Sequence, residues 1–358
     1  MLVGYPIKAT EENWLHDSLA EIIRTIHEKL NTNQEMPSWI ELIPTELDPD
    51  NRDSLLRIRG IKDRVLNYKK CVETCSQTER DIIFQTLNNQ NNIVGLLGNT
   101  TPILNLRADF PTVYDVAHDL FVFAYDKLTD LGIRDRQYKT IFEALKVNTC
   151  PFCGFDRIMS PHETRQDQDH YLAKSIYPFA AANMRNLVPM CRCCNRDYKH
   201  NIDIIKDLSG NRRKAFDPYN TPEISISLIN SIPFEGCKNK LPAWWIEFSP
   251  NLEETETWDQ VFSIRTRYSR EVLNKGFNRW IESFMNWCKA KAYPKTFTNE
   301  QVLEVLRKHY RNTEFENPVG LDFLKPKVFE MLVFHFESGN ERVIRFIRNA
   351  VIGIKLPA

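Results

Sequence analysis

The 358-residue sequence has no excess of charge of either sign, because 47 lysines and arginines are matched by 47 aspartates and glutamates. A neutral chain does not favour a polyanionic partner as a whole, so any surface for nucleic acid must be a local basic patch. No run of 18 or more apolar residues is present, which argues against a membrane span. The first residues, MLVGYPIKATEENW, lack the basic stretch and apolar core of a signal peptide. We therefore predict a cytoplasmic protein with no membrane partner.

Internal repeats and low-complexity segments are also absent, and the composition is that of an ordinary globular protein, with 42% hydrophobic and 26% charged residues. A chain of this length predicts two or three domains and can bury a sizeable core without disulfides. The nine cysteines are therefore expected to be thiols or metal ligands rather than cross-links.

The pattern of apolar residues predicts three regions and a mostly helical α+β fold. Residues 1–148 form a predicted helical N-terminal region, in which the segment 10–31, opened by Thr10, is the clearest amphipathic helix. Residues 149–215 lose helical periodicity and become rich in Cys, His, Asn, Asp and Arg. Residues 216–358 are predicted to be α+β. Strand-like alternation is seen in three segments of this last region, 223–232, 244–250 and 261–269.

Two pairs of cysteines with metal-ligand spacing frame the middle region. Cys150 and Cys153 lie in CPFCG, where Gly154 allows the sharp turn that brings two thiolates to one ion. Cys191 and Cys194 lie in CRCCN, and 37 residues separate Cys153 from Cys191. Four thiolates close a tetrahedral shell and leave no open position, so the sequence predicts a structural zinc site with a segment inserted between its halves.

Two other interpretations of these cysteines are possible. Cys193 offers a competing register, although Cys191 with Cys194 keeps the two-residue spacing and makes Cys193 a bystander. The cysteines could also be ordinary core residues, but two CxxC pairs by chance are less expected than one metal site.

The segment framed by the cysteines contains further polar residues in a recognisable order. Asp169 and His170 lie in QDQDHYLAKSIYP, Asn186 lies in RNLVPMC, and Asn195 and Lys199 lie in CCNRDYK. The order Cys-x-x-Cys, Asp-His, Asn-Leu, Cys-x-x-Cys-Asn, Lys resembles the HNH nuclease module of the ββα-metal class. The resemblance covers roughly residues 150–200, about a seventh of the chain, and does not extend to the flanks.

Phosphodiester hydrolysis needs a general base and a metal ion, and the Asp169–His170 pair offers residues suited to both. His170 is suited to act as general base, because an ordinary histidine pKa lies near the working pH. Asp169 offers a hard oxygen to Mg²⁺ or Mn²⁺. Adjacent side chains of an extended strand point to opposite faces, so both residues can act at one site only if the strand ends or twists there.

The resemblance implies roles for the remaining residues. Asn195 is the implied second ligand of the catalytic Mg²⁺ or Mn²⁺, and Asn186 is the implied brace of the loop that orients the base. Relatives often have Pro where Ala173 stands, a departure that touches no catalytic role. Three basic side chains are predicted to contact substrate phosphate: Lys174, Arg196 and Lys199.

The resemblance implies a metal-dependent HNH endonuclease that hydrolyses DNA and leaves 5′-phosphate and 3′-hydroxyl ends. One alternative is a zinc-ribbon module that binds nucleic acid or protein without cutting, and another is an RNase that uses the same site. Residues 192–214 carry seven basic and three acidic residues, which fits either a phosphate-facing patch or a solvated face.

The module and the Asp217-Pro-Tyr seam that follows it resemble HNH effectors of bacterial anti-phage systems, such as Septu-type systems and retron-associated relatives. Such a resemblance implies an ATPase companion. The sequence has no GxxxxGK[ST] motif, so we expect any ATPase to be a separate chain. A stand-alone homing or restriction nuclease is the alternative.

Overall fold

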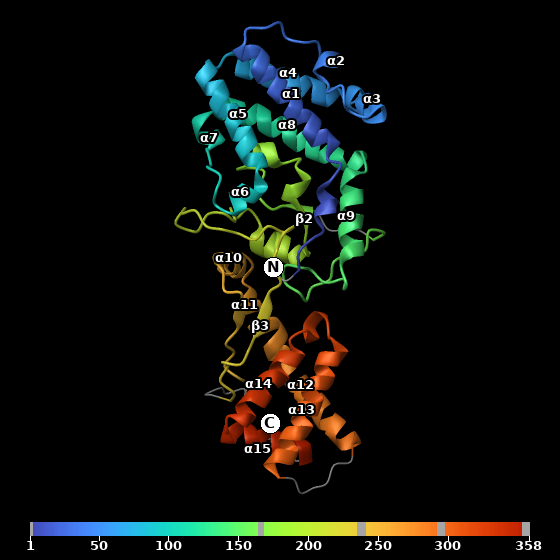
Figure 1. Ribbon diagram of the computed structural model, residues 1–358, viewed down its shortest axis with the longest axis vertical. Helices are drawn as coiled ribbons and strands as arrows, with labels where there is room; N and C mark the ends of the chain where they lie inside the picture. Colours follow the sequence, from blue (N-terminus) through green and yellow to red (C-terminus); the bar gives the residue numbers. More distant parts are fainter. Residues whose placement is uncertain (1–2, 164–167, 235–240, 292–297, 353–358) are drawn as a thin grey trace. The chain divides into compact units, whose positions relative to one another are not determined.

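The computed structural model describes residues 3–163, 168–234, 241–291 and 298–352 (Figure 1). The chain divides into two compact units. The N-terminal unit consists of Gly4–Asn148 and Ile158–Pro222, and the C-terminal unit of Met1–Val3, Thr149–Arg157 and Glu223–Ala358. This division differs from the three predicted regions, because most of the predicted middle region packs into the same unit as the N-terminal helices. None of the helices within the described residues combines the length and apolar character needed to span a membrane.

The N-terminal unit is built around amphipathic helices, as the apolar periodicity predicts. Helix α1 (Trp14–Asn31) buries one face, with Leu15, Leu19, Ile22 and Ile26 fully inside. Its predicted start at Thr10 is wrong by one turn, because a separate 3-10 turn ends there and α1 begins after Asn13. The other helices of this unit are α2 (Trp39–Leu42), α3 (Pro49–Arg57), α4 (Arg59–Glu73), α5 (Gln77–Asn91), α6 (Ile93–Leu97), α7 (Leu106–Asp109), α8 (Pro111–Asp130) and α9 (Ile133–Ala144).

The segment after Ile158 is attached to these helices through an apolar anchor. Phe179 is fully buried, and its ring packs edge-on against Phe121 of α8 and Tyr68 of α4, with centroids 5.6 and 6.4 Å away. Its backbone N–H donates to Gln90 Oε1 of α5 at 3.0 Å. Burying a ring of this size contributes about 2 kcal/mol, so the anchor fixes the position of the loop that follows it.

This segment forms a small ββα arrangement. Strand β1 (Gln168–His170) pairs antiparallel with β2 (Leu187–Pro189), and His170 lies opposite Leu187 in the register. The chain then enters a helical segment of π type, η4 (Cys193–Lys199). The hydrogen bonds of the pair hold the end of β1 against the start of β2, which is the part of the chain that carries the predicted site residues.

The C-terminal unit contains a second two-stranded antiparallel sheet, β3 (Ser225–Ser227) with β4 (Glu247–Ser249), inside two of the predicted strand segments. The third predicted strand, 261–269, is wrong, because the chain there is helical. The apolar residues Val261, Ile264, Tyr268 and Val272 recur at three- and four-residue steps and are buried, so they form one helical face. The helices of this unit are α10 (Glu253–Phe262), α11 (Ile264–Arg267), η5 (Tyr268–Leu273), α12 (Asn274–Ala290), α13 (Asn299–Glu316), α14 (Lys325–Glu337) and α15 (Glu341–Ile352).

A buried histidine makes the C-terminal unit sensitive to acid. His309 of α13 is 3% exposed and lies among the rings of Phe284, Trp287 and Phe329. Neither of its ring nitrogens has a hydrogen-bond partner among the described residues. Burial lowers the pKa of His309 from 6.5 to about 4. As the pH falls below 6.5, the unfolded chain therefore binds a proton that the folded chain resists, and folding loses free energy.

We expect His309→Leu to stabilise the C-terminal unit by about 1 kcal/mol at neutral pH, because it removes two unsatisfied buried nitrogens. The variant should also lose part of the fall in stability between pH 6.5 and 4 that His309 causes, on the order of 2 kcal/mol. Urea unfolding followed at several pH values measures both effects. His335→Leu is the matched control, since His335 Nε2 bonds the carbonyls of Ile229 and Ser231 and its loss should destabilise.

Candidate metal centre and Asp-His site

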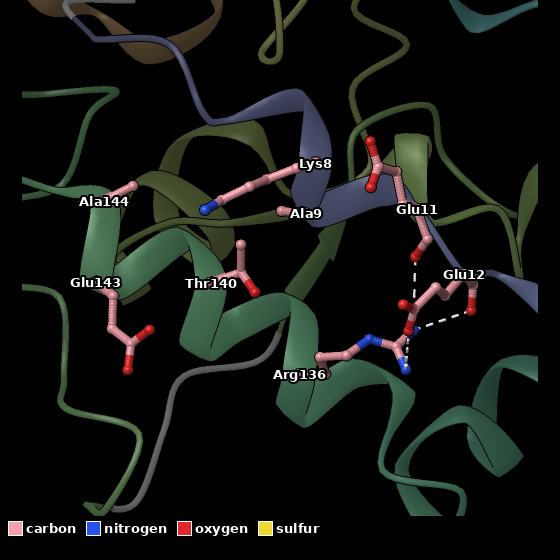
Figure 2. Close-up of a pocket in the computed structure, with 8 residues that line it drawn as sticks. All are labelled: Lys8, Ala9, Glu11, Glu12, Arg136, Thr140, Glu143 and Ala144. Carbon is pink, nitrogen blue, oxygen red and sulfur yellow. Dashed lines mark hydrogen bonds and ion pairs between the residues drawn. The ribbon is translucent and has the colours of Figure 1, made fainter.

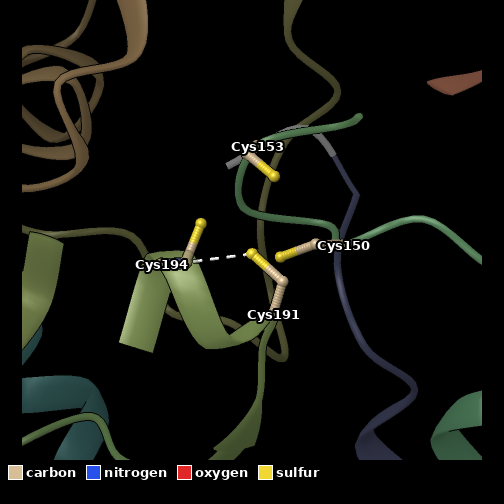
Figure 3. A group of neighbouring side chains, drawn as sticks. All are labelled: Cys150, Cys153, Cys191 and Cys194. Atoms are coloured by element: carbon tan, nitrogen blue, oxygen red, sulfur yellow. Dashed lines mark hydrogen bonds between the residues drawn. The ribbon is translucent and has the colours of Figure 1, made fainter. Parts of the chain in front are cut away.

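Four cysteine thiols form a compact, buried cluster (Figure 3). The Sγ atoms of Cys150, Cys153, Cys191 and Cys194 all lie within 4.8 Å of one another, and each residue is at most 2% exposed. Sulfurs around a tetrahedral zinc ion, bound at about 2.3 Å, are about 3.8 Å apart. The four thiols therefore fit a metal ion such as zinc with small shifts of their side chains. The predicted grouping is confirmed, and Cys193 lies outside it.

Local backbone structure positions each pair of thiols. In the first pair, Cys150 N donates to Asp156 O at 2.7 Å, and Gly154 N donates to Cys150 O at 2.7 Å. Gly154 has a φ of 76°, a left-handed conformation that glycine adopts without strain. In the second pair, Cys194 N donates to Cys191 Sγ at 3.3 Å, a contact that favours a thiolate at Cys191.

The Asp169–His170 pair lies where β1 ends. His170 is the last residue of the strand, and Tyr171 N then donates to Asn186 O at 2.8 Å as the chain turns away. Both side chains can act at one site only if the strand ends or twists at this pair, and the strand does end there. Asp169 and His170 need not remain on opposite faces of a continuing strand.

The His170 ring is held as a neutral base in a defined tautomer. It is 8% exposed, and its centroid lies 4.3 Å from that of Tyr125. Nε2 lies 3.0 Å from Ala181 O. A carbonyl can only accept, so Nε2 carries the proton and Nδ1 keeps its lone pair. Burial, helped by the charges of Lys174 and Lys199, lowers the pKa of His170 to about 3, which leaves the imidazole neutral at physiological pH.

The Asp169 carboxylate is bound by an ammonium group. Lys199 Nζ lies 2.6 Å from Asp169 Oδ2 and donates to His170 O at 2.8 Å. The Lys199 side chain is 1% exposed and that of Asp169 is 13% exposed. This placement does not support the predicted contact of Lys199 with substrate phosphate, because a buried ammonium binds the nearest anion, which is Asp169.

Asn186 braces the loop that follows His170. It is fully buried at the end of a 3-10 turn, and Leu172 N donates to its Oδ1 at 2.7 Å. Its Nδ2 donates to Leu172 O at 3.0 Å and to Ala180 O at 3.2 Å. Ala180 precedes the residue whose carbonyl holds the His170 ring. These hydrogen bonds hold the loop between Leu172 and Ala180, and the part of Asn186 in orienting a catalytic base stays a prediction.

We expect Asn186→Ala to lower the free energy of unfolding of the N-terminal unit by about 3 kcal/mol, because it leaves buried backbone groups at Leu172 without their partner. Asn183→Ala is the control, because Asn183 is only half-buried and caps one turn through Arg185 N, so its loss should cost about 1 kcal/mol. Urea-unfolding midpoints give both values. Equal losses in the two variants would contradict the bracing role.

The structure gives less information on the roles of the other predicted site residues, Asn195, Arg196 and Lys174. Asn195 is half-buried in the first turn of η4, where its backbone N donates to Cys191 O at 3.0 Å. Its role as a metal ligand stays a prediction. Arg196 is exposed, and Lys174 is half-buried, with its Nζ 5.2 Å from the centroid of the Tyr125 ring.

Some of the basic residues in the segment 192–214 form hydrogen bonds within the protein. Arg212 donates to Leu96 O at 2.9 Å and to Asn99 Oδ1 at 3.0 Å, and Arg213 Nε donates to Ile204 O at 2.9 Å. Arg192 and Lys214 are exposed. The basic charge that can face an external phosphate is therefore smaller than the count over residues 192–214.

Residues far upstream also build the site, and sequence reasoning missed them. Gln168 Nε2 donates to Gln137 Oε1 of α9 at 3.0 Å, and Arg134 Nε donates to Gln168 Oε1 at 2.9 Å. Gln137 Nε2 in turn donates to Met184 O at 2.8 Å. Tyr125 of α8 lies against His170 as described above. Nothing in their local sequence distinguishes these residues from ordinary helix positions, and only the packing reveals them.

A cavity of about 320 Å³ on the N-terminal unit has a different character (Figure 2). It lies between the start of the chain and α9, and charged residues of both signs line it. Arg136 Nη1 forms an ion pair with Glu12 at 2.9 Å, and Arg136 Nη2 donates to Glu12 O at 2.9 Å. These contacts tie the first residues of the unit to α9, which gives the cavity a structural explanation.

Comparisons with protein-family models, with curated proteins and with solved structures found no match. Any assignment of function therefore rests on the cysteine cluster and on the geometry around Asp169 and His170.

Proposed function

We propose that the protein is a metal-dependent HNH endonuclease that hydrolyses phosphodiester bonds of DNA. The observation that carries the proposal is the position of Asp169 and His170 at the end of β1, in an antiparallel pair that leads into η4 and Asn195. This ββα order, inside a frame of four buried cysteines, is the arrangement expected of the HNH module.

The tautomer of His170 fits the role of general base, whereas its pKa of about 3, well below the working pH, makes the ring a weaker base than the ordinary histidine expected from the sequence. Nδ1 is the nitrogen with the free lone pair, so it would take the proton of the attacking water. The hydrogen bond from Nε2 to Ala181 O would stabilise the imidazolium formed in that step. The neighbouring Tyr125 ring fixes the orientation of the imidazole and keeps bulk water from one side.

The surroundings of Asp169 fit a hard cation. Two oxygens, Asp169 Oδ2 and His170 O, converge on one cationic nitrogen, that of Lys199. Oxygen donors of this kind are the ligands that Mg²⁺ and Mn²⁺ prefer, so Asp169, with Asn195, would hold the catalytic ion. When bound, the ion would neutralise charge that develops on the phosphate.

The four-cysteine cluster would hold a structural zinc ion. Four thiolates fill a tetrahedral shell, which leaves no position for substrate. Because Cys191 lies two residues before η4 and Cys194 lies in its first turn, the ion would fix the helical segment that carries Asn195. The role of nuclease effector in an anti-phage system, with an ATPase on a separate chain, rests on the sequence resemblance alone.

A module that binds nucleic acid without cutting is the second candidate. The observation that favours it is the Asp169–Lys199 ion pair, because this pair takes up the carboxylate that a catalytic ion needs. The two functions make different predictions for Asp169→Asn. This variant should lose cutting in a nuclease but keep nucleic-acid binding in either case.

End-labelled DNA duplex, single-stranded DNA and RNA of the same sequence test the proposal, each incubated with the purified chain and Mn²⁺. We expect cutting of DNA, and ligase should reseal nicked duplex because the ends carry 5′-phosphate and 3′-hydroxyl. Faster cutting of RNA would assign the site to an RNase. Binding of DNA without cutting, in wild type and in Asp169→Asn alike, would favour the binding module.

A further inference from the structure

Lys199 holds a position that a divalent cation would need. It is the last residue of η4, and its ammonium contacts Asp169 Oδ2 at 2.6 Å and His170 O at 2.8 Å. With 1% of its side chain exposed, Lys199 is among the most deeply buried charged residues of the described chain. The ammonium therefore interacts mainly with these two oxygens, and water contributes little to its solvation.

The energetics of burial bind the lysine to this anion. A buried ammonium without a counterion costs several kcal/mol, whereas the pair with a carboxylate at this distance recovers most of that cost. A divalent ion on the same carboxylate would bind at about 2.1 Å from an oxygen. Its two charges would then lie a few ångströms from the ammonium, in surroundings that screen charge weakly. The two cations cannot occupy this position together.

We propose that Lys199 is a resident cation that competes with the divalent metal ion for Asp169. It is a positioning residue that keeps the carboxylate neutralised and oriented until a metal ion displaces it. The proposal rests on the proposed function in one respect, that Asp169 is a metal ligand. It adds that the metal affinity of the site is set by the cost of moving Lys199.

Displacement of Lys199 from Asp169 would also couple the binding of the metal ion to the binding of DNA. Once Lys199 leaves Asp169, its ammonium lacks a counterion in the protein interior. The displaced ammonium must then leave its buried position, and a phosphate of bound DNA would be its counterion there, so DNA lowers the cost of the displacement. Metal should consequently bind more weakly to the free protein than to its complex with DNA, which is a reciprocal coupling between the two ligands.

The test measures Mn²⁺ binding by electron paramagnetic resonance, on full-length protein whose cysteine site is filled with zinc. Lys199→Met removes the charge and keeps most of the side-chain volume, and it should bind Mn²⁺ at least about tenfold more tightly than wild type. Lys199→Arg keeps the charge and should bind Mn²⁺ no more tightly than wild type. Asp169→Asn should lose the site in both the wild-type and the Lys199→Met background, which separates it from adventitious sites.

Wild-type or weaker Mn²⁺ affinity in Lys199→Met, with zinc content and circular dichroism unchanged, would overturn the proposal. If Lys199→Met does not fold, Lys199→Gln replaces it, because the amide can still donate to Asp169 and His170 O without a charge. Lys199→Gln should likewise bind Mn²⁺ more tightly than wild type, and wild-type or weaker affinity in this variant would overturn the proposal. Tighter Mn²⁺ binding in Lys199→Met, together with no DNA cutting by the wild type, would overturn the proposed nuclease function but support competition between Lys199 and the metal ion. DNA cutting by the wild type, together with unchanged Mn²⁺ affinity in Lys199→Met, would support the nuclease function and overturn the competition.

Discussion

The Cys194→Ser variant is expected to lose its zinc ion and the folded structure around η4, whereas Cys193→Ser should keep both. Cys194 is one of the four clustered thiols, and Cys193, the preceding residue, lies outside the cluster. Binding of zinc to a four-thiolate site contributes on the order of 10 kcal/mol to folding, more than the net stability of many domains. A serine oxygen is a far poorer ligand for zinc than a thiolate, so most of this contribution should be lost.

The comparison of adjacent cysteines makes this prediction specific. Both variants replace one sulfur by oxygen in the same helical segment, so general effects of the substitution are shared. Zinc content per chain, measured together with circular dichroism and resistance to proteolysis, gives the outcome. One zinc per chain in Cys194→Ser, or its loss in Cys193→Ser, would contradict the assignment of the ligands.

His170→Ala should lower the rate of DNA cutting by about 10²- to 10⁴-fold, the range that a general base contributes. The physical reason is the tautomer fixed by Ala181 O, which leaves Nδ1 as a proton acceptor. Zinc content should stay at one per chain, because His170 is not among the clustered ligands. Rates are measured with enzyme in excess over a supercoiled plasmid, so that product release does not limit them.

His162→Ala is the control for His170→Ala, because His162 is exposed and lies in the same inserted segment. Its rate should remain within about twofold of wild type, as expected for a surface substitution. The buried His170 ring also packs on Tyr125, so the stability of His170→Ala is measured in parallel. A rate loss shared by both variants, or absent from both, would remove the catalytic role of His170.

Local spacing made part of the site predictable from sequence. Two residues between Cys191 and Cys194 are enough to identify them as a pair, and the structure groups them with Cys150 and Cys153. Periodicity over a full helix was equally informative, as α1 (Trp14–Asn31) shows, where only the start of the predicted helix was wrong. It failed over the short window 261–269, where a few residues fit both alternation and helical spacing.

Long-range contacts made the rest unpredictable. Lys199 was assigned to phosphate because its partner, Asp169, is distant in sequence, and only the fold brings the two side chains together. Tyr125 and Gln137 reach the site from α8 and α9, whose sequences read as ordinary helices. The buried state of His170, and with it the direction of its pKa shift, also depends on this packing.

The most direct test of the central claim, that Asp169 and His170 form a metal-dependent nuclease site, is nicking of a supercoiled plasmid by the zinc-loaded wild-type chain. The protein is held in excess, and nicked product is measured over time with Mn²⁺ and with EDTA. We expect nicks to accumulate in Mn²⁺ and the plasmid to stay intact in EDTA. A plasmid that remains intact in Mn²⁺, or is nicked equally in EDTA, would contradict the claim.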